Sequence, residues 1–229
     1  MVEETLSMRI KYSVQGYTLI EIFIVIAIIS VLAVVAGPEI LKALRSENQV
    51  KNAAMNLMTD LKFGENEAIR IGGGDVADPA GTGAFTMTKN SVFAVFSTAT
   101  NTYRIAGYED TNGNNQRDSN DTITSVIGSK PLDNNVVFGT LSSVNKTACW
   151  NATNSAPAAF ISFPADANPP CDGGLCLEFD SGGFPKFTGS TTSGVIYLTN
   201  KKDAFAVSIN AAGLLTLCKW DGQQWQITH

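Results

Sequence analysis

Histidine is almost absent from this sequence. Its 229 residues include one histidine, His229, so a Ser–His–Asp or Cys–His catalytic arrangement is poorly supported. A zinc site built from cysteine and histidine is poorly supported for the same reason. We therefore predict that the chain is not an enzyme, that it has no catalytic residues, and that it needs no cofactor apart from the structural calcium considered below.

Positive charge is also scarce. The chain has 16 Lys and Arg against 21 Asp and Glu, which gives a formal net charge of −5. Binding of nucleic acid requires a basic face, and the last part of the chain offers little beyond Lys201, Lys202 and Lys219. We expect that nucleic acid is not a partner. The normal share of apolar residues argues for a folded domain and against a disordered chain.

Cysteines are few and occur only well after the apolar N-terminal segment. They are Cys149, Cys171, Cys176 and Cys218. An even number of cysteines in the part that we expect to be exported favours disulfides over metal binding or thiol chemistry. Four cysteines allow three pairings, and the sequence does not choose among them. A small loop closed by Cys171 and Cys176 is one option, and a bond between Cys176 and Cys218 across neighbouring strands is another.

One long apolar run stands out near the N-terminus. From Tyr17 to Ala36 nearly every residue is apolar, and a helix of this length spans about 30 Å, the thickness of a hydrocarbon core. The run contains one carboxylate, Glu21, which costs about 2.5–3.5 kcal/mol inside a membrane and is therefore a functional candidate. If the chain is cut after Gly16, the new amine of Tyr17 is one helical turn from Glu21. In an assembly, the amine of one subunit can then meet the carboxylate of another.

The residues around this carboxylate resemble a known signature. Gly16, an aromatic residue, Thr-Leu-Ile-Glu21 and an apolar helix are similar to the prepilin motif of type IV pilins and type II secretion pseudopilins. A short hydrophilic leader and Pro38 after the apolar run also match, whereas Tyr17 replaces the usual Phe and keeps its aromatic character. The resemblance implies that prepilin peptidase cleaves between Gly16 and Tyr17 and methylates the amine of Tyr17. It also implies that Glu21 and Pro38 take part in subunit assembly.

This resemblance implies a role and a location. The chain is expected to be a minor pilin or pseudopilin, a structural and assembly-priming subunit of a type IV pilus or a type II secretion pseudopilus. Its partners are then other pilin subunits, prepilin peptidase and the bacterial inner membrane. Before it enters the filament, the chain is expected to be a single-pass protein of this membrane, with its globular domain outside the cytoplasm. The alternatives are an uncleaved, membrane-anchored extracytoplasmic binding domain, and a minor pilin for DNA uptake.

Four segments follow from the patterns along the chain. Residues 1–16 are the leader, with translation starting at Met1 or Met8, and 17–37 form the transmembrane or filament-core helix. Residues 38–71 continue this helix with amphipathic periodicity, and Gly72-Gly73-Gly74 stop it. Residues 72–229 form a β-rich extracytoplasmic globular domain.

The globular domain reads as a series of short strands separated by turns. The runs that predict strands are 91–96, 103–108, 122–127, 159–163, 175–179, 195–199, 204–209 and 214–218. We expect an α+β fold in which a long N-terminal helix, with a membrane half and an amphipathic half, packs on an antiparallel β-sheet domain, made of one sheet or a pair. The last third resembles the H-type minor pseudopilin and FimT/FimU minor pilin group, in its glycine-led Ile196-Tyr197-Leu198 strand and its Gly213 turn. Together with the helix, this implies the type IV pilin fold.

A twelve-residue stretch rich in Asp and Asn has the spacing of a calcium-binding loop. Oxygen-bearing side chains occupy positions one, three, five, nine and twelve, with a backbone carbonyl at position seven. Position six is Asn where glycine is expected, and position twelve is the shorter Asp. The alternative is an Asx-rich hairpin loop that needs no ion. The candidate calcium ligands are Asp110, Asn112, Asn114, Gln116, Asp118 and Asp121.

Overall fold

The computed structural model describes residues 18–71, 90–114, 117–133, 135–149, 155–187 and 192–228. Within the first range, side chains are described for residues 18–33 and 45–71. The chain divides into two compact units, Met1–Leu44 and Arg45–His229, and each is considered by itself.

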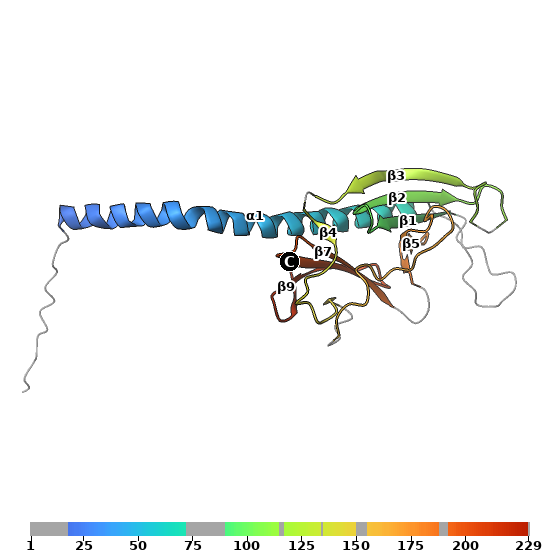
Figure 1. Ribbon diagram of the computed structural model, residues 1–229. Coiled ribbons are helices and arrows are strands. Elements are labelled where there is room, and N and C mark those ends of the chain that lie inside the picture. Colours follow the sequence, from blue (N-terminus) through green and yellow to red (C-terminus); the bar gives the residue numbers. More distant parts are fainter. Residues whose placement is uncertain are drawn as a thin grey trace, which may run out of the picture. The chain divides into compact units, whose positions relative to one another are not determined.

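Helix α1 comprises Leu19–Ile71, 53 residues (Figure 1). The sequence pattern placed this helix from about Tyr17 to about Ile71. Its backbone stays helical through Gly37 and Pro38. In the second unit, every third or fourth side chain of α1 is buried, so that one face of the helix belongs to the hydrophobic core. The buried apolar side chains on this face are those of Val50, Ala53, Ala54, Leu57, Leu61 and Ala68.

The first sheet contains five antiparallel strands in the order β3-β2-β1-β5-β6. The strands are β1 (Asn90–Ser97), β2 (Thr102–Glu109), β3 (Thr122–Pro131), β5 (Leu175–Phe179) and β6 (Pro185–Lys186). Strand β1 pairs with its neighbour in sequence, β2, and also with β5, which lies far along the chain.

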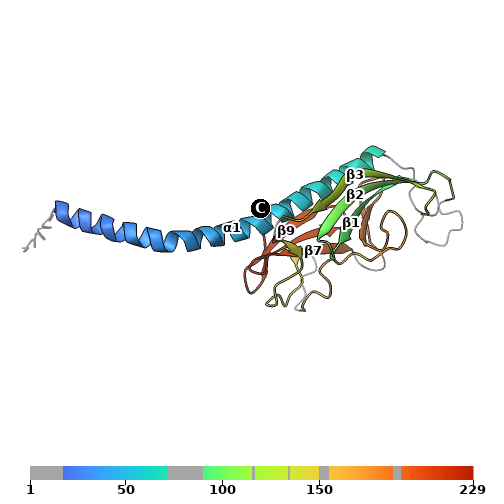
Figure 2. The ribbon, with the colours of Figure 1, turned by 45° about the horizontal axis from the view of Figure 1, so that its top comes forward.

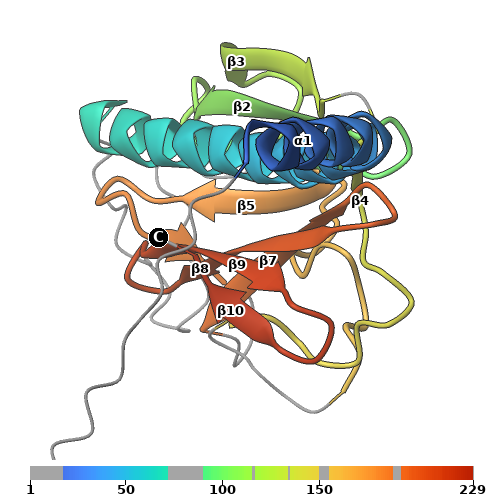
Figure 3. The same cartoon turned by 90° about the vertical axis from the view of Figure 1, so that its left-hand side faces the viewer.

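The second sheet also has five antiparallel strands, in the order β10-β9-β8-β7-β4. Figure 3 shows β7, β8, β9 and β10 lying side by side. The strands are β4 (Val137–Phe138), β7 (Ser193–Thr199), β8 (Ala204–Asn210), β9 (Leu215–Trp220) and β10 (Trp225–Ile227).

The main core joins one face of each sheet to the buried face of α1. Strands of both sheets lie along the second half of α1 (Figure 2). Alternation along β1 shows how a strand serves two clusters, because successive side chains point to opposite faces. Val92 and Ala94 belong to the main core with Leu57 and Leu61 of α1. Phe93, one position along, lies in a separate cluster on the other face of the sheet.

A polar anchor holds the first residues of α1 in the second unit. Ser46 donates its hydroxyl to Asp203 at 2.9 Å, and Asn200 donates its amide to the Ser46 carbonyl at 2.8 Å. Lys219 of β9 pairs with Glu47 at 2.7 Å. These contacts tie α1 to the turn between β7 and β8 and to β9.

The fold class expected from the sequence is wrong. The expectation was an α+β type IV pilin fold, with a long helix that has a membrane half packed on an antiparallel β-sheet domain. Among the described elements strands are instead the most numerous: ten strands and one helix, with the strands in two separate antiparallel sheets of five strands each. Within the residues described, no helix combines the length and apolar composition needed to cross a membrane. The reason is that local periodicity detects elements one at a time, whereas sheets are formed by pairing between distant strands.

Candidate functional site

The first turn of α1 is closed by a reciprocal pair of side chains. The Glu21 carboxylate accepts the Thr18 backbone N–H at 3.2 Å, and the Thr18 hydroxyl accepts the Glu21 backbone N–H at 3.3 Å. This arrangement is a capping box, which satisfies backbone donors that have no partner inside the helix. Thr18 and Glu21 have the Thr-x-x-Glu spacing of that motif, and the sequence reasoning missed this local role for Glu21.

The helix beyond this cap exposes apolar side chains on all sides. The large apolar residues from Leu19 to Leu32 are between 51% and 74% exposed. An exposed apolar surface of this extent is typical of a site that associates with a membrane or with other proteins. A helix that is apolar on all sides is usually buried, either in a membrane or in the core of a large protein or assembly. These residues are Leu19, Ile20, Ile22, Phe23, Ile24, Val25, Ile26, Ile28, Ile29, Val31 and Leu32.

The other predicted processing and assembly residues are only partly covered by the structure. Gly16 and Tyr17, the expected cleavage and methylation residues, lie outside the described residues. Pro38 lies within α1, and its side chain is outside the described set. Cleavage, methylation and the role of Pro38 in assembly remain predictions.

The Asp- and Asn-rich stretch 110–121 connects β2 to β3. Its carboxylates accept hydrogen bonds from the loop itself: Asp110 accepts the Gly113 N–H at 2.7 Å, and Asp121 accepts the Asp118 N–H at 2.8 Å. The Asn120 backbone N–H, followed by the Asn114 side-chain amide, holds the pKa of Asp118 below its ordinary value. These bonds are those of an Asx-rich turn.

The same loop was the candidate calcium site. No group of three or more His, Cys, Asp or Glu side chains that could hold a metal ion occurs in the described part of the chain. Asn112 and Asn114 donate their amides to Asp118 at 3.2 Å and 2.8 Å, and Gln116 lies outside the described residues. Calcium binding by this loop stays a prediction.

The four cysteines form two disulfides, Cys149–Cys218 and Cys171–Cys176. The small loop considered from the sequence is therefore present, and the Cys176–Cys218 bond is not. Each disulfide has a cysteine that packs with a cluster on the outer face of a sheet. Cys171 and Cys176 pack with Phe93 and other residues of the first sheet, and Cys149 packs beside the cluster on the second sheet.

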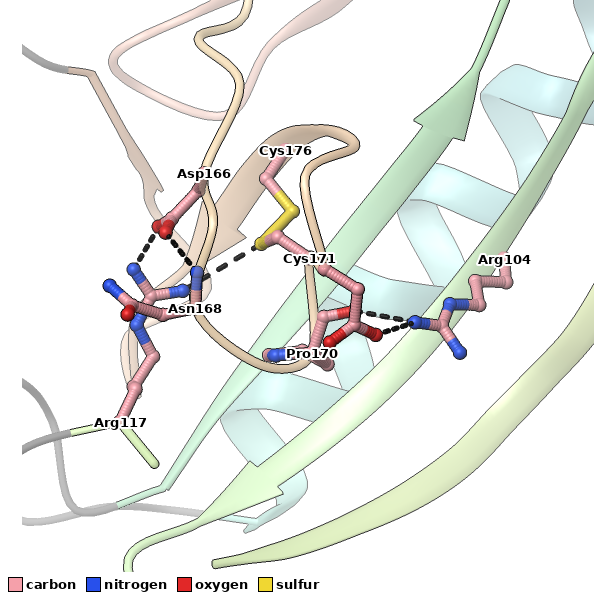
Figure 4. The surroundings of a disulfide bond; sticks show 8 residues. Arg104, Arg117, Asp166, Asn168, Pro170, Cys171 and Cys176 are labelled. Atoms are coloured by element: carbon pink, nitrogen blue, oxygen red, sulfur yellow. Dashed lines mark hydrogen bonds and ion pairs between the residues drawn. A yellow bond between two sulfur atoms is a disulfide. The ribbon is translucent and has the colours of Figure 1, made fainter. Parts of the chain in front are cut away.

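Two arginines approach the loop that contains Cys171 and Cys176 from opposite sides (Figure 4). Arg117, in the connection between β2 and β3, forms an ion pair with Asp166. Its guanidinium also lies over the ring of Phe93, 4.9 Å from the centroid. Arg104 of β2 donates through Nη2 to the Pro170 carbonyl at 2.5 Å and to Asp172 at 3.0 Å. The sequence reasoning identified neither arginine, because both act through residues more than 45 positions away.

Comparison with known proteins identifies no relative. No family model, no curated protein and no solved structure matches this chain.

The sequence's one histidine, His229, lies outside the described residues. The absence of enzymatic activity stays a prediction.

Proposed function

We propose that this chain is a minor pilin or pseudopilin, a structural and assembly-priming subunit of a type IV pilus or a type II secretion pseudopilus. The observation that carries the proposal is Glu21, a carboxylate in the first turn of a helix whose next dozen residues expose apolar side chains on every side. A prepilin-like motif that runs from Gly16 to Glu21 supports the same function.

The exposed apolar surface of α1 needs a partner, because such a surface is unfavourable in water. In the proposed function, the inner membrane covers it before assembly and the helices of neighbouring subunits cover it afterwards. The two disulfides fit this route, since disulfides persist in oxidising compartments outside the cytoplasm.

Glu21 has one partner before assembly and another one after it. In the single chain its carboxylate caps α1 through Thr18. In the filament it pairs with the methylated amine of Tyr17 of a neighbouring subunit, so that neither charge is buried alone. Gly37 and Pro38 are the position at which α1 loosens when subunits pack, because proline removes one helical hydrogen bond.

Mass spectrometry of the chain after expression with a prepilin peptidase tests the proposal. The expected product begins at N-methylated Tyr17, and a Gly16→Val variant that blocks the cleavage position provides the control. A chain that keeps its leader in the presence of an active peptidase contradicts the proposal. It favours instead an uncleaved, membrane-anchored extracytoplasmic binding domain.

A second alternative is a minor pilin for DNA uptake. The formal net charge of −5 disfavours it, because affinity for DNA comes largely from Lys and Arg contacts to phosphates. Gel shifts of the full chain at low and high salt distinguish the two functions. We expect no shift at either salt concentration, and a shift that salt abolishes would establish DNA binding.

A further inference from the structure

A cavity of about 550 Å³ lies on the outer face of the first sheet, a size typical of sites for small ligands. The ends of β1 and β2 form part of its lining, together with Ser129 of β3 and the loop from Cys171 to Leu175. The proposed filament function assigns no role to this cavity.

The disulfide loop forms a closely packed wall of the cavity. Cys171 is bonded to Cys176, and the Gly174 N–H donates to the Cys171 carbonyl at 2.7 Å. A Cβ atom added at Gly174 would lie 2.9 Å from this carbonyl oxygen and 3.0 Å from the Val95 side chain. Asp172, which is not a glycine, has φ of +51°, and such left-handed conformations cluster at functional sites.

Arg104 provides hydrogen-bond donors at this cavity. Its Nη2 atom makes both of the contacts described above, so its Nε and Nη1 atoms keep three N–H donors that have no partner among the described residues. The β2–β3 register shifts between Tyr103 and Ile105, which places Arg104 at a β-bulge. Bulges near functional sites redirect a side chain. Its side chain is 39% exposed.

The polar groups of the cavity carry no net charge. Arg104 and Asp172 form an ion pair, and the other polar lining side chains are hydroxyls. Ser97 accepts the Thr100 hydroxyl at 2.8 Å, and Thr100 and Thr102 share a hydrogen bond of 2.8 Å. An anion would be attracted by Arg104 but repelled by Asp172. A neutral ligand with adjacent hydroxyls can accept from the guanidinium and donate to the carboxylate at the same time.

We propose that this cavity binds a neutral, hydroxyl-rich ligand of the saccharide class. Arg104 donates to its ring or hydroxyl oxygens, Asp172 accepts from a hydroxyl, and the Ser97, Thr98 and Ser129 side chains complete the polar rim. Ligand binding in this cavity does not depend on filament assembly, so it can be tested independently of the proposed filament function.

Saturation-transfer NMR on the full chain, held in a detergent without a sugar headgroup, tests this site. The probes are the methyl glycosides of glucose, galactose and N-acetylglucosamine, with glucuronate as an anionic probe of similar size. We expect transfer to at least one neutral glycoside that is insensitive to salt, with little transfer to glucuronate. Arg104→Gln should weaken binding about tenfold, because it removes three donors at one position.

Two further variants make the result decisive. Arg70→Gln is the matched control, because Arg70 is an exposed arginine on α1 that pairs with Glu67 away from the cavity; it should leave the signal unchanged. Ser129→Leu, which places a larger apolar side chain at the rim, should abolish the signal. It replaces Arg104→Gln as the test of the site if that variant fails to fold. The proposal is overturned if none of the three glycosides binds, if glucuronate binds better, or if the cavity variants bind as the wild type does.

Discussion

Gly194, in strand β7, lies where no larger residue fits. A Cβ atom added there would overlap the aromatic ring of Phe163, which is buried in the main core. We predict that Gly194→Ala lowers the free energy of unfolding by about 1–3 kcal/mol, because overpacking forces a core side chain or the backbone to shift. Denaturant unfolding of the variant measures the loss.

Two companion variants identify the cause of this loss. Phe163→Leu should recover part of it in the double variant, since the clash is a pairwise interaction. Gly128→Ala should change stability by less than about 0.5 kcal/mol, because nothing lies within 4 Å of the added Cβ. If the alanine costs as much at Gly128 as at Gly194, the cause is the strand backbone and not Phe163.

The two roles of Glu21 can be separated by a single substitution. Glutamine at this position keeps the capping box, which accepts Glu or Gln, but removes the charge. We predict that Glu21→Gln leaves the helicity of α1 unchanged and lowers incorporation into filaments at least tenfold. Thr18→Ala should lower the helicity of α1, because it loses about 1 kcal/mol of helix capping. It should leave incorporation into filaments unchanged, because it keeps the charge.

Circular dichroism measures the helicity of α1, and the amount of subunit in sheared filaments measures incorporation. Normal incorporation of the Glu21→Gln subunit would show that the carboxylate serves the helix cap and not a neighbouring subunit.

Tyr103 makes stability depend on pH in the alkaline range. Burial, and then the hydrogen bond to Asp60 at 2.6 Å, raise the pKa of Tyr103. Because the pKa is about 10 in the unfolded chain, the folded chain holds the proton more tightly. The resulting stabilisation is complete below about pH 10 and is lost as the pH rises above it.

We predict that the thermal midpoint of the wild type falls more steeply above about pH 10 than that of Tyr103→Phe. Asp60 keeps its ion pair with Lys130 in this variant, so the loss of the hydroxyl leaves no carboxylate unpaired. Equal slopes for the two proteins would show that Tyr103 does not govern the alkaline transition.

Some residue roles were accessible from the sequence and others were not. The capping box is a local motif, and its Thr18 and Glu21 are three positions apart, so the spacing alone contains the signal. The contacts of Arg104 and Arg117 with the disulfide loop join residues that only the tertiary fold brings together. No local pattern distinguishes these arginines from solvated ones.

The two disulfides link elements of the fold and close loops of very different length. Cys149–Cys218 has a sequence separation of 69 and Cys171–Cys176 a separation of 5. By the loop-entropy relation, the first stabilises the fold by about 4 kcal/mol and the second by about 2 kcal/mol. We predict that Cys149→Ser with Cys218→Ser lowers the free energy of unfolding more than Cys171→Ser with Cys176→Ser does.

Urea unfolding of the two double variants checks this order. A mild reductant applied to the wild type is the control for effects of the serine side chains. An equal or reversed order would mean that packing of the loops, and not closure of the chain, dominates the effect of the disulfides.

Strand prediction succeeded where apolar residues form a run of sufficient length. The run 175–179 is strand β5, and the runs 91–96 and 103–108 lie within β1 and β2. The predicted strand at 159–163 is wrong: only an isolated bridge between Ile161 and Ile196 occurs there. The missed strands β4, β6 and β10 have two or three residues each, too few for any period to appear.

At the scale of the whole molecule, the pairing of strands could not be predicted. Strand β5 joins the first sheet by pairing with β1, and β4 joins the second by pairing with β7. Both pairings cross long stretches of chain, and they decide that two five-stranded sheets form. The pattern of apolar residues is the same whether such strands form one sheet or two.

The unit Arg45–His229 contains both sheets and both disulfides. We predict that a chain beginning at Arg45 folds by itself and is monomeric without detergent, because it lacks the exposed apolar surface from Leu19 to Leu32. A chain beginning at Leu19 should self-associate under the same conditions. Sedimentation velocity measures both, and an oligomeric chain beginning at Arg45 would place the association surface in the β-rich unit.

The cap at the start of α1 has a thermodynamic consequence for polymerisation. A carboxylate that leaves the Thr18 N–H for an amine on a neighbouring molecule exchanges one electrostatic contact for another, so the net enthalpy of that exchange is small. What holds a protomer in the finished fibre is then the isoleucine- and valine-rich stretch that follows. A protomer that leaves the fibre outside the membrane exposes this stretch to water, which is unfavourable. That penalty comes from the entropy of water and weakens on cooling. A fibre built from this chain would therefore be expected to loosen in the cold and tighten with warmth.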